Sequence, residues 1–101
     1  MKSYSIVWTS RSVSELVVSV EFIANVSLEA AQKLRDDLYN SISSLSTLPE
    51  RNQVFDMPKG FSKTIRKLVV NKRYIVLYAI EDSSIVIYSI QDTRRKFTRL
   101  I

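Results

Sequence analysis

The sequence predicts an α+β domain in which a helical hairpin packs on one face of a mostly antiparallel four-stranded sheet, in the order β-α-α-β-β-β. Apolar and polar residues alternate near the start of the chain and again from residue 64 onward, which is typical of strands. Between these stretches the apolar residues recur every third or fourth position, which indicates helices. The chain has 101 residues, so we expect one domain over residues 1–101.

The first strand and the first helix follow from adjoining patterns. Residues 3–9 alternate, which predicts a strand with one buried face. The residues of that face are Tyr4, Ile6 and Trp8. Ser12 and Glu15 have the spacing of a capping box, which predicts that a helix begins there. One helical face then carries Val13, Leu16, Val17, Val20 and Ile23. Several of these residues are β-branched, so a strand is the alternative, but the spacing favours a helix.

A second helix is expected after a short turn. Ser27 is its predicted N-cap, and Glu29 in the first turn suits the positive end of the helix dipole. Its apolar stripe consists of Ala31, Leu34, Leu38, Ile42 and Leu45. Pro49 cannot continue the helix. The connection between the two helices is so short that they must form an antiparallel hairpin.

The second half of the chain is predicted to be a long loop followed by a meander. Residues 46–63 contain both prolines and the only glycine, and loops of this length are often functional. Short turns separate the three predicted strands, so the strands pair antiparallel. The strands are Ile65–Val70, Arg73–Ile80 and Ile85–Ile90, and a basic tail over Arg94–Ile101 follows them. One face of the sheet remains open to water or to a ligand.

The composition excludes several kinds of chemistry. The chain has no histidine, no cysteine and one glycine. This excludes a Ser-His-Asp triad, a thiolate nucleophile, an ordinary zinc site and a glycine-rich phosphate loop, so we expect no metal and no cofactor. The first ten residues have no apolar run of signal length, and no apolar stretch approaches a membrane span. We therefore expect a cytoplasmic protein without a membrane partner.

The charge is unevenly distributed. Residues 1–50 hold four Lys and Arg against six Asp and Glu, a net charge of −2, whereas residues 51–101 hold eleven against four, a net charge of +7. Solvated surface charge is the simpler interpretation. A bias of this size also favours a polyanion or an acidic protein as the partner of the second half.

Four stretches, in this order and spacing, resemble the RelE/ParE superfamily of toxins from bacterial type II toxin–antitoxin pairs. They are Tyr4–Thr9, Ser27–Leu34, Arg66–Tyr78 and Ile90–Arg95. The resemblance covers nearly the whole chain and implies a small basic toxin neutralised by an acidic antitoxin. It leaves the target open, because RelE-like toxins cut mRNA in the ribosomal A site and ParE-like toxins poison DNA gyrase. A degenerate toxin that keeps only its antitoxin-binding surface is a third interpretation.

RNA cleavage would require a base, an acid and a stabiliser of phosphate charge. The resemblance suggests a catalytic group of Arg66, Arg73, Asp92, Arg94 and Arg95. In this group Asp92 could act as the base and Arg94 or Arg95 could hold the phosphate bidentately. We expect the four arginines to converge on one exposed face. The alternative is that Asp92 pairs with an arginine and that the group only holds the antitoxin.

Several positions depart from the RelE pattern. Ile75 stands where RelE-like toxins often have a catalytic arginine, and Arg73 should point to the same face as Ile75. Phe97 lies nearest to the family's tail tyrosine, and its ring can stack on a base but cannot transfer a proton. Lys59 and Lys63 in the long loop are further candidates for RNA binding, with solvated surface as the alternative. The altered positions favour a ParE-like inhibitor that is not an enzyme.

Overall fold

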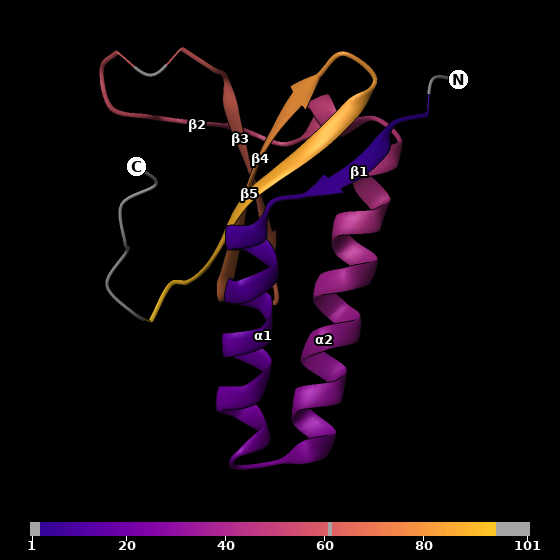
Figure 1. The fold of residues 1–101 in the computed structure, drawn as a ribbon, viewed down its shortest axis with the longest axis vertical. Helices are drawn as coiled ribbons and strands as arrows, with labels where there is room; N and C mark the ends of the chain where they lie inside the picture. The colour runs from indigo at the N-terminus through magenta and orange to yellow at the C-terminus, as the bar shows by residue number, and fades with distance from the viewer. Residues whose placement is uncertain (1–2, 61, 95–101) are drawn as a thin grey trace.

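The computed structural model describes residues 3–60 and 62–94 and has two layers, a helical hairpin and a five-stranded mixed sheet (Figure 1). The predicted α+β class is confirmed. The helices are α1 (Ser10–Ala24) and α2 (Leu28–Ser43), followed by the short 3-10 helices Ser44–Ser46 and Pro49–Arg51. The strands are β1 (Ser5–Trp8), β2 (Val54–Phe55), β3 (Ile65–Val70), β4 (Tyr74–Glu81) and β5 (Ser84–Asp92). No helix within the described ranges is both long and apolar enough to cross a membrane.

The sheet has the strand order β1-β5-β4-β3-β2. β3, β4 and β5 form the predicted antiparallel meander, and β1 pairs with β5 in parallel. β2 is a strand of two residues inside the segment that was expected to be a loop, and it pairs antiparallel with the start of β3. The sheet therefore has one short edge strand more than the four that the sequence predicts.

The start of α1 differs from the prediction. Thr9 is the N-cap: its Oγ1 accepts a hydrogen bond from the Ser12 N–H at 3.2 Å, and the Ser12 hydroxyl donates to the Thr9 carbonyl oxygen at 2.8 Å. The predicted capping box of Ser12 and Glu15 is wrong, because the Glu15 carboxylate turns to β5 instead. The start of α2 is as predicted, with the Ser27 hydroxyl oxygen accepting from the Ala30 N–H at 3.1 Å.

The core lies between the hairpin and one face of the sheet. From α2 and the turn after it, Leu34, Leu38, Ile42 and Leu45 are buried against residues of β3, β4 and β5. From α1, Leu16, Val20 and Ile23 pack against the same core and are partly buried. A second, smaller cluster covers the opposite face of the sheet, where Phe55 and Met57 pack on Ile65, Leu77 and Ala79. The segment after α2 is therefore partly folded down on the sheet.

A buried tyrosine ties the segment after α2 to the core. Tyr78 in β4 is fully buried, and its hydroxyl donates to the Pro49 carbonyl oxygen at 2.6 Å and accepts from the Asn52 side-chain amide at 3.1 Å. Burial raises the pKa of Tyr78. The neutral hydroxyl is thus part of the fold, and it fixes the turn that leads into β2.

We expect the substitution Tyr78→Phe to lower the free energy of unfolding by about 1–2 kcal/mol, because the buried Pro49 carbonyl and the Asn52 amide lose their partner. Urea unfolding of the two chains measures this difference. Tyr39→Phe is the matched control, because Tyr39 is 59% exposed. Equal losses in the two variants would contradict the structural role of the Tyr78 hydroxyl.

Candidate functional site

Three of the predicted site residues meet where the β3–β4 turn lies beside the end of β5. Tyr74, the first residue of β4, pairs with Asp92, and the Thr93 N–H donates to the Arg73 carbonyl oxygen at 2.8 Å. The backbones of Arg73, Asp92 and Arg94 therefore lie side by side, and we call these three residues the arginine corner. Lys72, beside Arg73 in the turn, is exposed.

Within the arginine corner, Asp92 holds Arg94. The Asp92 side chain is 6% exposed and that of Arg94 is 51% exposed. Oδ1 of Asp92 accepts from the Arg94 backbone N–H at 3.0 Å and from Nε at 3.4 Å, and Oδ2 accepts from Nη2 at 3.2 Å. The carboxylate thus fixes the arginine in place while the guanidinium still faces solvent. This is the pairing that the sequence left open as the alternative to a free general base.

Arg73 supplies the second guanidinium of the corner. Its Cζ lies 5.6 Å from the centroid of the Tyr74 ring, a cation–π distance. Its Nε is buried and has no hydrogen-bond partner among the residues that the structure describes. Because this nitrogen is covered by other protein atoms, it is not open to a bound anion. Within the corner, the half-exposed guanidinium of Arg94 is therefore the group that a phosphate or a carboxylate can reach.

Arg66 lies apart from the corner, so the predicted convergence of the arginines on one face is wrong for this residue. Arg66 pairs with Tyr78, whereas Val70 at the other end of β3 pairs with Tyr74. At about 3.3 Å per residue, Arg66 and Val70 are roughly 13 Å apart along β3. Nη1 of Arg66 donates to the carbonyl oxygens of Asn52 at 2.7 Å and Glu50 at 3.2 Å. The turn before β2 needs donors for these carbonyls, and Arg66 supplies them.

The remaining predicted residues are separate from the corner or outside the described chain. Lys63 donates through Nζ to Oε2 of Glu81 at 2.9 Å, and the Tyr88 hydroxyl donates to the same oxygen at 2.5 Å. Lys59 is exposed in the β2–β3 loop beside Gly60, which has a φ of 95°. Arg95 and Phe97 lie outside the described residues.

The Lys63, Glu81 and Tyr88 side chains shift one another's ionisation. Hydrogen bonds from the Tyr88 hydroxyl and then from Lys63 lower the pKa of Glu81. The bond to Glu81 raises the pKa of Lys63, and burial followed by the bond to Glu81 raises that of Tyr88. The group carries no net positive charge, so it is a weaker anion site than the arginine corner. No cluster within residues 3–60 and 62–94 could hold a metal ion.

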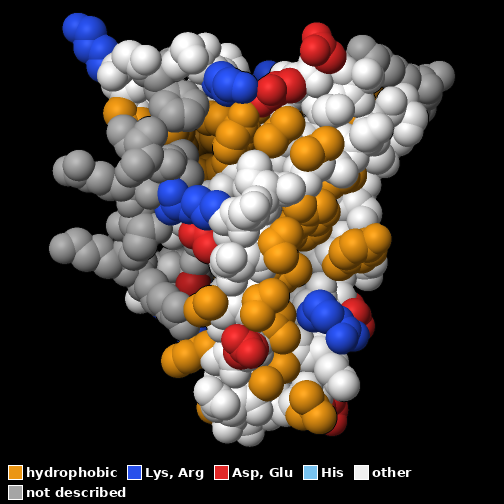
Figure 2. Space-filling view, viewed as in Figure 1, with side chains coloured by type: hydrophobic (Ala, Val, Ile, Leu, Met, Phe, Trp, Pro, Cys, Tyr) orange, Lys and Arg blue, Asp and Glu red, His pale blue; other side chains and the backbone are white. Residues whose placement is uncertain are grey.

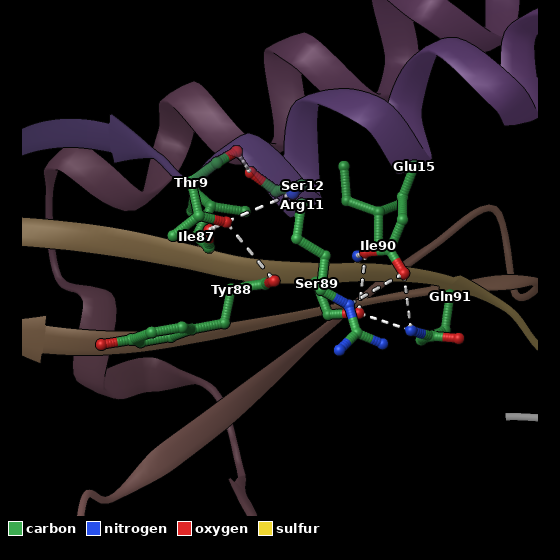
Figure 3. A network of polar contacts seen from close by, with 9 residues as sticks. All are labelled: Thr9, Arg11, Ser12, Glu15, Ile87, Tyr88, Ser89, Ile90 and Gln91. Atoms are coloured by element: carbon green, nitrogen blue, oxygen red, sulfur yellow. Dashed lines mark hydrogen bonds and ion pairs between the residues drawn. The ribbon is translucent and has the colours of Figure 1, made fainter. Parts of the chain in front are cut away.

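One polar network that the sequence did not reveal surrounds Glu15 (Figure 3). Its carboxylate accepts from the Ser89 hydroxyl, the Ile90 N–H, the Gln91 side-chain amide and Nε of Arg11. The only signal in the sequence is the i,i+4 spacing of Arg11 and Glu15. The β5 partners lie 74 to 76 positions away, beyond the reach of any local pattern.

Hydrophobic side chains run along the outward face of the helical hairpin (Figure 2). We call Val13, Val17, Leu28 and Tyr39 the hairpin patch; they are 45%, 47%, 66% and 59% exposed. Val13 and Val17 lie one helical turn apart, and Leu28 and Tyr39 lie three turns apart on α2. Of the face predicted for α1, Leu16, Val20 and Ile23 pack on the core, whereas Val13 and Val17 were predicted to lie there and are exposed instead. Contiguous exposed apolar surface is typical of sites that bind another protein.

Comparison with known proteins gives three findings. A family model described as the ParE toxin of the type II toxin–antitoxin system parDE matches residues 6–97. Toxin RelE2 from Caulobacter vibrioides is 30% identical over 90 residues, which cover 89% of this chain and 96% of the relative. A solved structure, the chromosomal ParDE TA system from P. aeruginosa, matches with a TM-score of 0.71 at 16% identity and covers 89% of this chain and 96% of that one. This last likeness shows that the fold is shared.

We expect Tyr88→Phe to raise the pKa of Glu81, because the substitution removes the hydroxyl that donates to the carboxylate most strongly. A pH titration of the Glu81 carboxyl carbon by NMR measures the shift. Folding lowers this pKa from its ordinary value of 4.5. The Glu81 carboxylate therefore stabilises the fold at pH values above 4.5, and this contribution is lost as the pH falls through the lower pKa of the folded state. Tyr39→Phe should leave the titration unchanged. An unaltered Glu81 titration in Tyr88→Phe would contradict the assignment.

Proposed function

Because the chain belongs to the ParE toxin family of type II toxin–antitoxin systems, we propose that it acts as a toxin by binding its target rather than by cutting RNA, and that this target is DNA gyrase. The arginine corner is the target-binding site in this proposal. Gyrase is a cytoplasmic enzyme, so the proposed site of action is the cytoplasm.

One observation carries the proposal: the candidate catalytic groups are already engaged with other parts of the fold. The Asp92 carboxylate is hydrogen-bonded to Arg94 through three donors, so it is poorly placed to accept a proton from an RNA hydroxyl. Arg66 donates to two backbone carbonyls at the other end of β3. A binding site needs only an exposed guanidinium, such as that of Arg94, and it needs no proton transfer.

Ribosome-dependent mRNA cleavage is the second candidate function. It is favoured by the group of Lys63, Glu81 and Tyr88, in which two proton-bearing side chains share one carboxylate oxygen. Incubation of the protein with programmed ribosomes, followed by mapping of the RNA 3′ ends, tests it. Cleavage in the A site would favour this function over gyrase inhibition.

An antitoxin is the partner that family membership implies, and we propose that it covers the hairpin patch. The apolar side chains of the patch come from both helices of the hairpin, Val13 and Val17 from α1 and Leu28 and Tyr39 from α2. Such a surface suits the apolar face of an amphipathic helix. The chain carries a net charge of +5, which favours an acidic partner. The antitoxin and the target would then use different parts of the molecule.

Charge reversal at the corner tests the target site. We expect Arg94→Glu to raise the concentration that inhibits gyrase supercoiling by at least about tenfold, because the anionic surface would then meet two carboxylates at the corner. The assay measures supercoiling by gyrase at increasing toxin concentration. Arg35→Glu is the matched control, because it makes the same change of charge at an exposed side chain of α2, away from the corner. No inhibition by an excess of the unaltered chain would remove gyrase as the target.

A substitution in the hairpin patch tests the antitoxin surface. We expect Val17→Asp to abolish co-purification with the proposed acidic antitoxin, because an aspartate would be buried without a partner in the complex. Val69→Asp is the control, because Val69 is 51% exposed on β3. Retained binding in Val17→Asp, or equal loss in both variants, would contradict the proposed surface.

A further inference from the structure

The outer edge of β5 loses its neighbouring strand halfway along its length. β1 pairs with β5 only as far as Trp8 and Ile87, whereas β5 continues to Asp92. At the next residue the Thr9 N–H and hydroxyl both donate to the Ile87 carbonyl oxygen, at 3.2 and 2.7 Å, and the chain then turns away into α1. The amides of β5 beyond this point need other acceptors, because a buried N–H without a partner is costly.

Glu15 replaces the missing strand (Figure 3). Its Oε1 accepts from the Ile90 N–H at 2.9 Å, which is the bond that a strand carbonyl would otherwise make, and from the Ser89 hydroxyl at 2.9 Å. Its Oε2 accepts from Nε2 of Gln91 at 3.0 Å and from Nε of Arg11 at 3.3 Å. Ser89 and Gln91 are 0% and 7% exposed, so most of this network is shielded from water.

The register of β5 changes where this replacement begins. Tyr78 pairs with Ile87 and Leu77 pairs with Ser89, so Tyr88 is an extra residue that forms a bulge. A bulge bends a strand and changes which groups face each edge. After the bulge, the Ile90 N–H points to α1 and meets the Glu15 carboxylate. The path of the last residues of β5 is therefore set by α1.

We propose that Glu15 is a positioning residue for the arginine corner. Ile90 and Gln91, which it holds, lead directly to Asp92, and Asp92 in turn fixes Arg94. The next residue, Thr93, donates its N–H to the Arg73 carbonyl oxygen. The inference rests on the proposed role of the corner in binding the target. Glu15 itself reaches the target only through these residues.

The chemistry of the network requires a carboxylate at this position. Four donors converge on the two oxygens of Glu15, and a carboxylate is the one side-chain group that accepts at both ends. A glutamine would have to turn its own NH₂ group toward the donors of Gln91 and Arg11. An aspartate is one methylene shorter and would leave the Ile90 N–H without an acceptor.

The test compares Glu15→Gln with Glu21→Gln, the same change at an exposed position of α1. In Glu15→Gln we expect amide hydrogen exchange of Ile90 and Thr93 to accelerate at least about tenfold, while exchange of Leu77 and Ile85 stays as in the unaltered chain. The inducer level needed for growth arrest in bacteria should rise. The double variant Glu15→Gln with Gln91→Glu should restore part of both readouts, because a carboxylate at position 91 can accept from the new amide at position 15, while Arg11 still lacks its acceptor.

Three outcomes would overturn the inference. The first is equal acceleration of exchange throughout β4 and β5, which would make Glu15 a general stabiliser. The second is local loosening with growth arrest unchanged, and the third is failure of the double variant to restore any part of the arrest. If Glu15→Gln does not fold, the milder variant Gln91→Ala must accelerate amide exchange at the same residues, Ile90 and Thr93, by a smaller factor. A chain that arrests growth without inhibiting gyrase would overturn the proposed target alone and would leave the Glu15 result intact.

Discussion

The free half of the β5 edge is the constraint on which the rest of the arrangement depends. β1 is four residues long and cannot cover a strand of nine residues, so the helix that follows it must supply the missing acceptors. This fixes α1 in two ways, through the packing of Leu16 and Val20 on the core and through the bonds of Glu15 to β5. With the helix held at this rotation, Val13 and Val17 remain on the outside. One requirement of the sheet thus also determines the apolar surface of the hairpin.

The same constraint explains what the sequence could and could not predict. α2 and the meander depend on periodic patterns and on the Ser27 cap, which are local, and both were predicted correctly. The role of Glu15 depends on residues that follow 74 to 76 positions later, so its spacing to Ser12 suggested a capping box instead. β2 has only two residues and no period that a pattern could detect. Alternation places Arg66 on a face of its strand but does not reveal the carbonyls that it meets.

The positive charge of the second half of the chain is divided among different tasks. Arg51 donates to the carbonyl oxygens of Ser44, Thr47 and Leu48, where it ends the helical segment. Arg66 serves the turn before β2, and Lys63 is paired with Glu81. The excess of bases therefore overstates the surface that can meet a partner. Arg94 keeps a half-exposed guanidinium beside the carboxylate that orients it, and the Arg73 backbone lies next to the neighbouring Thr93.

A double-mutant cycle between Glu15→Gln and Arg94→Ala tests the central claim most directly, namely that Glu15 acts on the target through Arg94. The quantity measured is the concentration of protein that inhibits the target by half. If Glu15 works by placing Arg94, the double variant should be no weaker than Arg94→Ala alone, because the guanidinium that Glu15 positions is already absent. Losses that add in full would mean that the two residues act independently, and they would contradict the account.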